Sequence, residues 1–316
     1  MPPARTSAPV GPVPRASSPV APLTVVGYDG GRLPGEAVAA LAAASLVIGG
    51  ERHLAAVDVP TGARRVVLGD LSAGLDALAG HDGSAVVVAS GDPGFFGVVR
   101  ALRARGLVPA VVPARSSVAV AFARLGLPWD DAVVVTAHGR DPRPAVNAAL
   151  AAPKAAVLTA PGATGAVVAP LLEAGRDVHV AERLGEARER VVRVTEPGLE
   201  HADPNVVVAV DPARDRGAGA GAPGPGWLAG HPGAPAGWAL PEDAFIHRDS
   251  MVTKAEVRAL ALARLGPRLG ACVWDVGAGS GSVAVECARF GAYAVALERD
   301  AASCGRIRSN AASHGV

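Results

Sequence analysis

Short valine-rich runs recur from Leu23 to Val210, and many of them lack a regular alternation of apolar and polar residues. Strands that are covered on both faces have this pattern. Alanine- and leucine-rich segments of helical length separate the runs, and Gly106 and Gly126 follow two of these segments, where helices commonly end. The alternation predicts an α/β fold with a largely parallel sheet. The expected strands are Leu23–Val26, Ser45–Ile48, Arg65–Leu68, Ala85–Ala89, Val108–Val112, Ala132–Thr136, Ala155–Thr159, Asp177–Ala181, Val191–Val194 and Val206–Val210, and the expected helices include Gly97–Arg105, Ser117–Leu125 and Ala163–Glu173.

Two stretches of the chain lack this pattern. Residues Met1–Pro22 hold seven prolines and no apolar core of signal-peptide length, which predicts a disordered leader. Residues Asp211–Ala239 hold thirteen glycines and prolines among twenty-nine residues, a composition typical of a linker. We therefore expect a first domain at 23–210 and a second at 240–316.

The second domain reads as a shorter α/β unit. Thr253 and Glu256 predict a capping box for a helix whose apolar face carries Val257, Leu260, Ala261 and Leu265. A strand at Ala271–Val276, a helix at Ser282–Arg289, a strand at Ala294–Glu298 and a last helix are expected to follow. Because a doubly wound sheet usually needs about five strands or more, the sequence predicts a domain that is incomplete at Val316 and only marginally folded by itself.

Composition favours a globular protein and argues against several other classes. Half of the residues are hydrophobic and 19% are charged, which is typical of globular chains, and no window approaches the ~18 apolar residues of a spanning helix. The net charge is +1 without a basic stripe, which argues against a nucleic-acid partner. Cys272, Cys287 and Cys304 are odd in number and lack CxxC spacing, so we expect neither a disulfide framework nor a metal site. These features predict a cytoplasmic protein that does not enter membranes.

The strongest local signal is the segment 275–281, Asp-Val-Gly-Ala-Gly-Ser-Gly, between an expected strand and an expected helix. Glycines at such a turn let a ligand approach the backbone and the helix N-terminus. Spacing leaves two cofactors open, because Gly279-x-Gly281-x-x-Ala284 with Glu298 also fits a loose dinucleotide pattern. The strand-ending Asp275 favours S-adenosylmethionine over NAD, since a carboxylate there can receive an ammonium group that NAD lacks.

In the first domain the informative segment is 89–97, Ala-Ser-Gly-Asp-Pro-Gly-Phe-Phe-Gly. It follows a buried strand, and open α/β sheets bind ligands at the carboxyl ends of their strands. A Gly-Asp-Pro turn offers exposed backbone amides, although such a turn by itself is common. Phe95 and Phe96 fit either the wall of a flat ligand's pocket or the protein core.

Several segments together resemble the tetrapyrrole methylase family, and most closely its branch that methylates precorrin-6Y. They are 89–97, 113–117, 125–129, 138–140, 182–185 and 204–208. The first loop, 27–31, departs from the family's GxGPG-type turn because it lacks the proline. The segment 275–281 resembles motif I of class I methyltransferases, and 245–248 with 251–258 resembles the opening segment of the class I methyltransferase of the cobalamin pathway.

The resemblance implies a tetrapyrrole methylase fold with two α/β subdomains, joined to a partial Rossmann-like class I domain. It implies methylation of precorrin-6Y at C5 and C15 with decarboxylation of the C12 acetate, in cobalamin biosynthesis, with S-adenosylmethionine as methyl donor. Because the second domain is expected to be incomplete, the C5 activity is the firmer expectation. The alternatives are an NAD-dependent oxidoreductase and a non-catalytic ligand-binding protein.

We also expect a homo-oligomer. The resemblance assigns candidate binding residues, although it points to no catalytic residue. The cofactor-binding candidates are Gly91, Asp92, Pro93, Phe96, Ser116, Ser117, Asp275, Gly277, Gly279, Gly281 and Glu298, and the substrate-binding candidates are His138, Arg140, Thr253 and Lys254.

Overall fold

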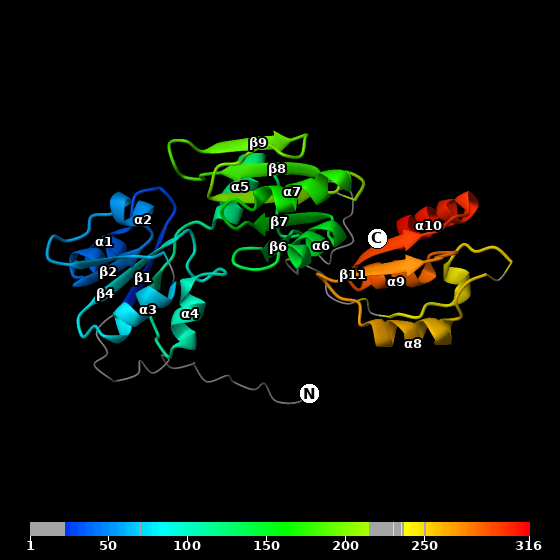
Figure 1. The fold of residues 1–316 in the computed structure, drawn as a ribbon, viewed down its shortest axis with the longest axis horizontal. Helices are drawn as coiled ribbons and strands as arrows, with labels where there is room; N and C mark the ends of the chain where they lie inside the picture. The colour runs from blue at the N-terminus through cyan, green and yellow to red at the C-terminus, as the bar shows by residue number, and fades with distance from the viewer. Residues whose placement is uncertain (1–22, 70, 215–229, 231–234, 236, 250) are drawn as a thin grey trace, which may run out of the picture. The chain divides into compact units, whose positions relative to one another are not determined.

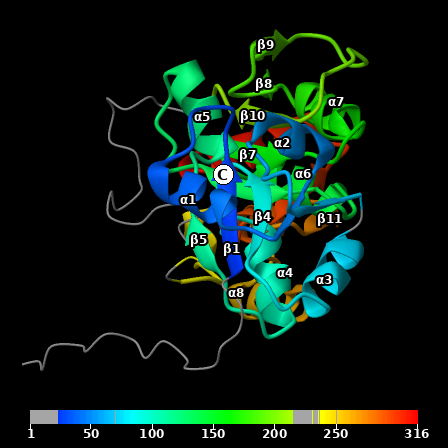
Figure 2. The same ribbon diagram turned by 90° about the vertical axis from the view of Figure 1, so that its left-hand side faces the viewer.

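The computed structural model describes residues 23–69, 71–214, 230, 235, 237–249 and 251–316 (Figures 1 and 2). The predicted leader and most of the predicted linker lie outside these residues. The chain divides into two compact units. The first contains the strand that ends at Tyr28 together with Arg32–Ala114, and the second contains Asp29–Gly31 and Arg115–Val316.

A parallel five-stranded sheet with the order β3-β2-β4-β1-β5 forms the first unit. Helices α1 and α2 contribute to a core cluster on one face and helices α3 and α4 to a cluster on the other. Val25 belongs to one cluster and Val26 to the other, so successive side chains of one strand are both buried. This explains why the valine runs do not alternate with polar residues. The elements are β1 (Leu23–Tyr28), α1 (Gly35–Ala42), β2 (Leu46–Gly49), α2 (Glu51–Ala56), β3 (Arg64–Val67), α3 (Leu71–Ala79), β4 (Ala85–Ser90), α4 (Val98–Ala104) and β5 (Ala110–Val112).

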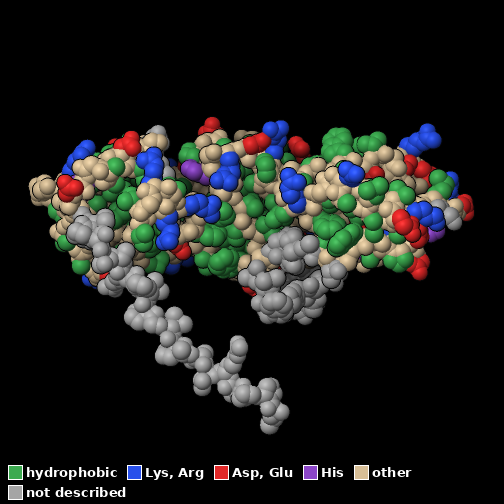
Figure 3. Space-filling model, turned by 90° about the horizontal axis from the view of Figure 1, so that it is seen from below, with side chains coloured by type: hydrophobic (Ala, Val, Ile, Leu, Met, Phe, Trp, Pro, Cys, Tyr) green, Lys and Arg blue, Asp and Glu red, His purple; other side chains and the backbone are tan. Residues whose placement is uncertain are grey.

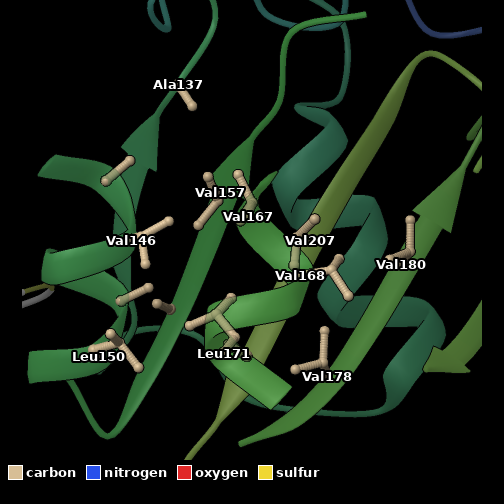
Figure 4. Packing of buried hydrophobic residues seen from close by; sticks show 14 of the residues in the cluster. Ala137, Val146, Leu150, Val157, Val167, Val168, Leu171, Val178, Val180 and Val207 are labelled. Carbon is tan, nitrogen blue, oxygen red and sulfur yellow. The ribbon is translucent and has the colours of Figure 1, made fainter. Parts of the chain in front are cut away.

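The second unit begins with a mixed five-stranded sheet of order β6-β7-β10-β8-β9. Only the β6–β7 pair is parallel among these strands, so the prediction of a largely parallel sheet is wrong here. Helices α6 and α7 cover one face and α5 the other (Figure 4), and a strand buried on both faces has the same valine-rich sequence whichever way its neighbours run. The elements are α5 (Ser117–Leu125), β6 (Val133–Thr136), α6 (Arg143–Ala151), β7 (Lys154–Leu158), α7 (Thr164–Glu173), β8 (Asp177–Glu182), β9 (Arg190–Val194) and β10 (Asn205–Val210).

The ten strands expected before the linker are all present, each within two residues of its predicted bounds. The three named helices are present as well, and Gly126 ends α5 in the left-handed conformation, at φ +66°. The α/β fold class with two α/β subdomains is therefore confirmed.

The C-terminal segment contains a two-stranded parallel sheet, β11 with β12, in which Asp275 pairs with Ala296. The predicted order of strand, helix, strand and helix is confirmed. The elements are a 3-10 turn η2 (Glu242–Ala244), α8 (Ala255–Leu265), β11 (Cys272–Val276), α9 (Ser282–Arg289), β12 (Tyr293–Leu297) and α10 (Ala301–Ser313).

Helix α8 differs from its prediction. Its N-cap is Lys254, whose side chain makes no capping hydrogen bond, so the Thr253 and Glu256 capping box is wrong. The first amide of the helix, Ala255 N, instead donates to Glu242 Oε1 at 3.2 Å. The predicted apolar face is also wrong, because Val257, Leu260 and Leu265 are all more than half exposed. Arg258 and Leu262 are the buried residues of the helix.

The buried face of α8 is set by an ion pair rather than by an apolar stripe. Arg258 Nε lies 2.7 Å from Glu286 Oε1, and both side chains are fully buried. The guanidinium also donates to the carbonyl oxygens of Leu240 and Thr253, while the Glu286 carboxylate accepts the amides of Ala239 and Leu240. The pair thus ties the segment before α8 to α9, with every partner hydrogen-bonded, as a buried charge requires.

Among the described helices, none combines the length and the apolar character that a bilayer crossing requires. Basic and acidic side chains are interspersed over the described surface that Figure 3 shows.

We expect Arg258→Met to destabilise the C-terminal segment by about 3–5 kcal/mol, because the Glu286 carboxylate would stay buried without its cation. Arg264→Met is the matched control, since Arg264 is exposed on the same helix and its replacement should change stability by about 0.5 kcal/mol or less. Chemical denaturation measures the stability of both variants, and amide hydrogen exchange in α8 and α9 shows whether the loss lies in the C-terminal segment. Equal effects of the two variants would contradict the structural role of the pair.

Candidate active site

The carboxyl ends of three neighbouring strands meet closely in the first unit. A Cβ built on Gly27, in β1, would overlap the carbonyl oxygen of Gly91 after β4 and would lie 2.5 Å from the amide nitrogen of Ala114 after β5. The amide of Gly91 also donates to Tyr28 O at 2.8 Å. This edge of the sheet is therefore built from backbone in direct contact, which only glycine at position 27 permits.

The loop of residues 91–97 leaves this edge and is stabilised by its own hydrogen bonds. Gly91 has φ +58°, Asp92 Oδ1 accepts the amide of Gly94 at 2.8 Å, and Asp92 O accepts the amide of Phe95 at 3.1 Å. Pro93 is buried, and a Cβ on Gly97 would lie 2.6 Å from Pro93 O. The carboxylate of Asp92 therefore orders the turn. Binding of a ligand by the backbone of this loop stays a prediction.

The two aromatic residues of this loop lie at the surface. Phe95 is 38% and Phe96 is 42% exposed, and their rings form an edge-to-face pair with centroids 4.7 Å apart. Phe96 has φ +53°, in the left-handed region that a residue with a side chain rarely adopts. Of the two sequence interpretations, core packing is therefore wrong, and contact with a ligand stays a prediction.

A polar cluster at the same edge was missed by the sequence analysis. His53 Nε2 lies 3.0 Å from Ser90 Oγ, and Arg52 Nη2 donates to the same oxygen at 2.6 Å. His53 is only 8% exposed; its burial, together with the nearby Arg52 guanidinium, lowers its pKa to about 4. The sequence did offer one sign of this cluster, because His53 lies near the start of a helix that follows a buried strand.

The His53 imidazole predicts a pH dependence of stability. Its pKa is about 4 in the folded chain against an ordinary 6.5, so the unfolded chain binds the proton more tightly. The contribution to stability is fully present above pH 6.5 and is lost as the pH falls towards 4. We expect the free energy of unfolding of His53→Gln to fall less steeply over this range than that of the wild type, as urea titrations at several pH values would show. Parallel curves would contradict this protonation behaviour.

In the second unit, the loop of Asp29–Gly31 packs against Gly185. A Cβ on Gly30 would overlap Gly185 O, and a Cβ on Gly185 would overlap Asp29 O, while both glycines have positive φ. Arg115 Nε forms an ion pair with Asp29 Oδ2 at 2.6 Å and, with the Gly31 amide, holds the pKa of Asp29 below its usual value against the opposing effect of burial. This loop, which lacks the proline of the family turn, is thus in close backbone contact with Gly185.

The other candidates of this unit occupy defined positions. Ser116 is the N-cap of α5, and its hydroxyl oxygen accepts the amide of Val118 at 3.2 Å. Ser117 is the first residue of that helix. His138 comes shortly after β6, with Nδ1 3.3 Å from Thr159 O, and Arg140 is exposed in the same turn. A cavity of about 400 Å³ lies against α6 and α7, but no candidate residue lines it.

The C-terminal segment brings Asp275, Glu298 and the glycine loop together. Asp275 Oδ2 accepts the amide of Ala284 in the first turn of α9, at 3.1 Å, and burial raises the pKa of this carboxyl. Glu298 accepts the amides of Asp300, Gly279 and Arg299, which hold its pKa below the usual value. Two carboxylates therefore flank one loop at the ends of adjacent parallel strands, and Asp275 Oδ1 has no hydrogen-bond partner among the described residues.

The three glycines of the loop differ in their surroundings, although all have positive φ, between +58° and +78°. A Cβ on Gly277 or Gly279 would meet no atom within 4 Å, which leaves the open space that a bound ligand needs. A Cβ on Gly281 would lie 2.9 Å from Ile307 Cγ1, so a side chain there would press on α10, and contact of Gly281 with a cofactor stays a prediction.

Thr253 and Lys254 directly precede α8, and their partners lie outside the glycine loop. Thr253 O accepts from Arg258, and Lys254 Nζ lies 3.8 Å from Glu242 Oε1. Within the described part of the chain, neither residue makes a hydrogen bond to the glycine loop.

These surroundings predict different effects of two alanine substitutions. Gly279→Ala should cost about 1–2 kcal/mol, the strain of a left-handed conformation alone. Gly281→Ala should cost more, because the new Cβ also presses on Ile307, and the double change Gly281→Ala with Ile307→Val should recover part of the loss. Thermal unfolding monitored by near-UV circular dichroism tests the order, and a Gly281→Ala as mild as Gly279→Ala would contradict the contact with Ile307.

Comparison with known proteins assigns both parts of the chain. The tetrapyrrole (corrin/porphyrin) methylase family matches residues 26–200, and the precorrin methyltransferase domain family matches residues 243–316. A precorrin-6Y C(5,15)-methyltransferase (decarboxylating) of Sinorhizobium is 36% identical over 93% of this chain and 71% of the relative. The chain belongs to this family.

A second decarboxylating precorrin-6Y C(5,15)-methyltransferase, from Mycobacterium tuberculosis, is 33% identical over 86% of this chain and 68% of the relative. Among solved structures, the methyltransferase CobJ has a TM-score of 0.50 at 22% identity, over 61% of this chain and 95% of that chain. That likeness shows the fold alone. The two family matches together take in nearly all of the described first unit and most of the described part of the second, the mixed sheet through β9 and the glycine loop included.

Proposed function

We propose that this protein transfers methyl groups from S-adenosylmethionine to the C5 and C15 positions of a precorrin, with decarboxylation, in cobalamin biosynthesis. The observation that carries the proposal is the pair of carboxylates, Asp275 and Glu298, that flank an open glycine loop in a chain of this family. Following the resemblance of the two parts, we assign the C5 reaction to the part that the tetrapyrrole methylase family matches and the C15 reaction with decarboxylation to the C-terminal segment.

The residues of the glycine loop fit the methyl donor. Asp275 Oδ1, which has no partner among the described residues, would accept the ammonium group, and Glu298 would accept the ribose hydroxyls. A nearby cation favours the charged form of a carboxyl whose pKa burial has raised, so this interaction would hold Asp275 ionised. The open space beside Gly277 and Gly279 would admit the donor to the backbone.

The main contribution of the protein to methyl transfer is to position the donor and the acceptor. The bound cofactor supplies a methyl group on a positively charged sulfur, and displacement needs the accepting carbon in line with that bond. In the first unit the backbone of residues 91–97 would hold the donor, and the exposed rings of Phe95 and Phe96 would flank it or the flat substrate. In the second, His138 and exposed Arg140 would bind carboxylates of the substrate.

The two alternatives from the sequence have less support. The dinucleotide pattern from Gly279 offers no reason for an acidic residue at the end of β11, and the relatives are named as methyltransferases rather than oxidoreductases. A non-catalytic binding protein would likewise leave these names unexplained. A homo-oligomeric assembly and a cytoplasmic location stay predictions of the sequence.

Isothermal titration of the full chain with S-adenosylhomocysteine and with NADH tests the proposal. We expect S-adenosylhomocysteine to bind at two sites and NADH at none. Asp275→Asn should weaken one of the two sites about tenfold or more, because it removes a charge-assisted hydrogen bond. Asp249→Asn is the control, since Asp249 is an exposed carboxylate of the same segment. Binding of NADH without S-adenosylhomocysteine would contradict the proposal.

A further inference from the structure

The hydroxyl of Ser90 occupies a distinctive position in the first unit. Ser90 is the last residue of β4 and directly precedes the loop of residues 91–97, and its side chain is exposed. Strands β2 and β4 are parallel neighbours, so the start of α2, which follows β2, lies at the same edge of the sheet. Arg52 and His53, from that helix, both contact Ser90 Oγ.

The directions of these hydrogen bonds follow from the chemistry of the groups. A guanidinium only donates, so Ser90 Oγ accepts from Arg52. His53 Nδ1 is buried without a hydrogen-bond partner, and a proton there would be an unsatisfied donor, which proteins avoid more strictly than an unsatisfied acceptor. The proton of the neutral ring is therefore on Nε2, which donates to Ser90 Oγ as well.

This arrangement leaves the Ser90 hydroxyl as a donor only. Its oxygen accepts two hydrogen bonds, and its proton has no acceptor among the described residues. The low pKa of His53 keeps the ring neutral at ordinary pH, so the arrangement persists. A free donor on an exposed residue, with a guanidinium 2.6 Å from its oxygen, is suited to an anionic oxygen.

We propose that the Ser90 hydroxyl binds a carboxylate oxygen of a ligand at the edge of the first sheet, with Arg52 and His53 as positioning residues. The inference rests on the proposed function, which offers two sources of the carboxylate. One is the amino-acid part of the methyl donor, and the other is a carboxylate side chain of the precorrin. Both would place a negatively charged oxygen beside the loop that follows Ser90.

The test compares Ser90→Ala with Ser45→Ala in the full chain. Ser45 is a matched control, because its hydroxyl lies 2.9 Å from His81 Nε2 and it precedes β2, at the opposite end of the same sheet. Both variants also carry Asp275→Asn, which weakens the C-terminal site. The probes are S-adenosylhomocysteine, 5′-methylthioadenosine, which lacks the amino-acid carboxylate, and the precorrin substrate of the C5 reaction.

Two outcomes support the proposal and distinguish the sources. If the carboxylate is that of the donor, Ser90→Ala weakens S-adenosylhomocysteine about tenfold or more and leaves 5′-methylthioadenosine unchanged. If it is that of the substrate, Ser90→Ala raises the KM for the precorrin by a similar factor and leaves S-adenosylhomocysteine unchanged. Ser45→Ala should change neither quantity.

The role of His53 is tested by two replacements. His53→Gln places an amide donor near the position of Nε2, whereas His53→Leu removes the donor and keeps a similar volume. We expect His53→Leu to reproduce the effect of Ser90→Ala on affinity or KM and His53→Gln to stay within about threefold of the wild type. A merely structural histidine would lower the unfolding temperature in both variants without changing the affinity.

The failures of the two proposals are distinct. If the wild type binds S-adenosylhomocysteine and methylates the precorrin while Ser90→Ala matches it in affinity and KM, the Ser90 proposal is wrong and the proposed function stands. If the wild type neither binds S-adenosylhomocysteine nor methylates the precorrin, the proposed function is wrong, and this inference falls with it.

Discussion

Close backbone contact at the ends of the strands is the constraint on which the rest of the structure depends. Gly27 has no room for a Cβ because the loop after β4 and the segment after β5 lie against it. Gly30 and Gly185 make a similar contact within the second unit. The Gly27 contact holds the loops after β4 and β5 at the carboxyl edge of the parallel sheet, which is where open α/β sheets bind ligands. A side chain at any of the three positions would displace the loop that it touches.

Burial and backbone amides set the protonation behaviour of the polar groups at these edges. Asp275 is partly buried with one amide partner, and its carboxyl pKa is raised; Glu298 has three amide partners, and its pKa is lowered. Two carboxylates beside one loop thus differ in charge behaviour because of their surroundings alone. His53 follows the same principle, since its burial keeps the imidazole neutral and lets it hold Ser90.

Helix α8 shows where inference from periodicity fails. Val257, Leu260 and Leu265 have helical spacing, yet they are exposed, because the Arg258 and Glu286 ion pair occupies the buried face. A charged residue counts as polar in any pattern, so the sequence offers no sign that it will be buried. The partner, Glu286, lies twenty-eight residues away on another helix, and only folding brings the two together.

Sequence by itself determined the positions of the strands, the α/β class, the two candidate loops and the family, because burial on both faces and glycine turns leave local patterns. It did not determine strand direction in the second sheet, since buried valine runs are alike in parallel and antiparallel pairs. Nor did it identify the cluster of Arg52, His53 and Ser90, in which Ser90 lies thirty-eight and thirty-seven residues after the other two. Hydrogen-bond partners and protonation depend on neighbours that only the tertiary structure supplies, and they decided which groups at the sheet edge are free to meet a ligand.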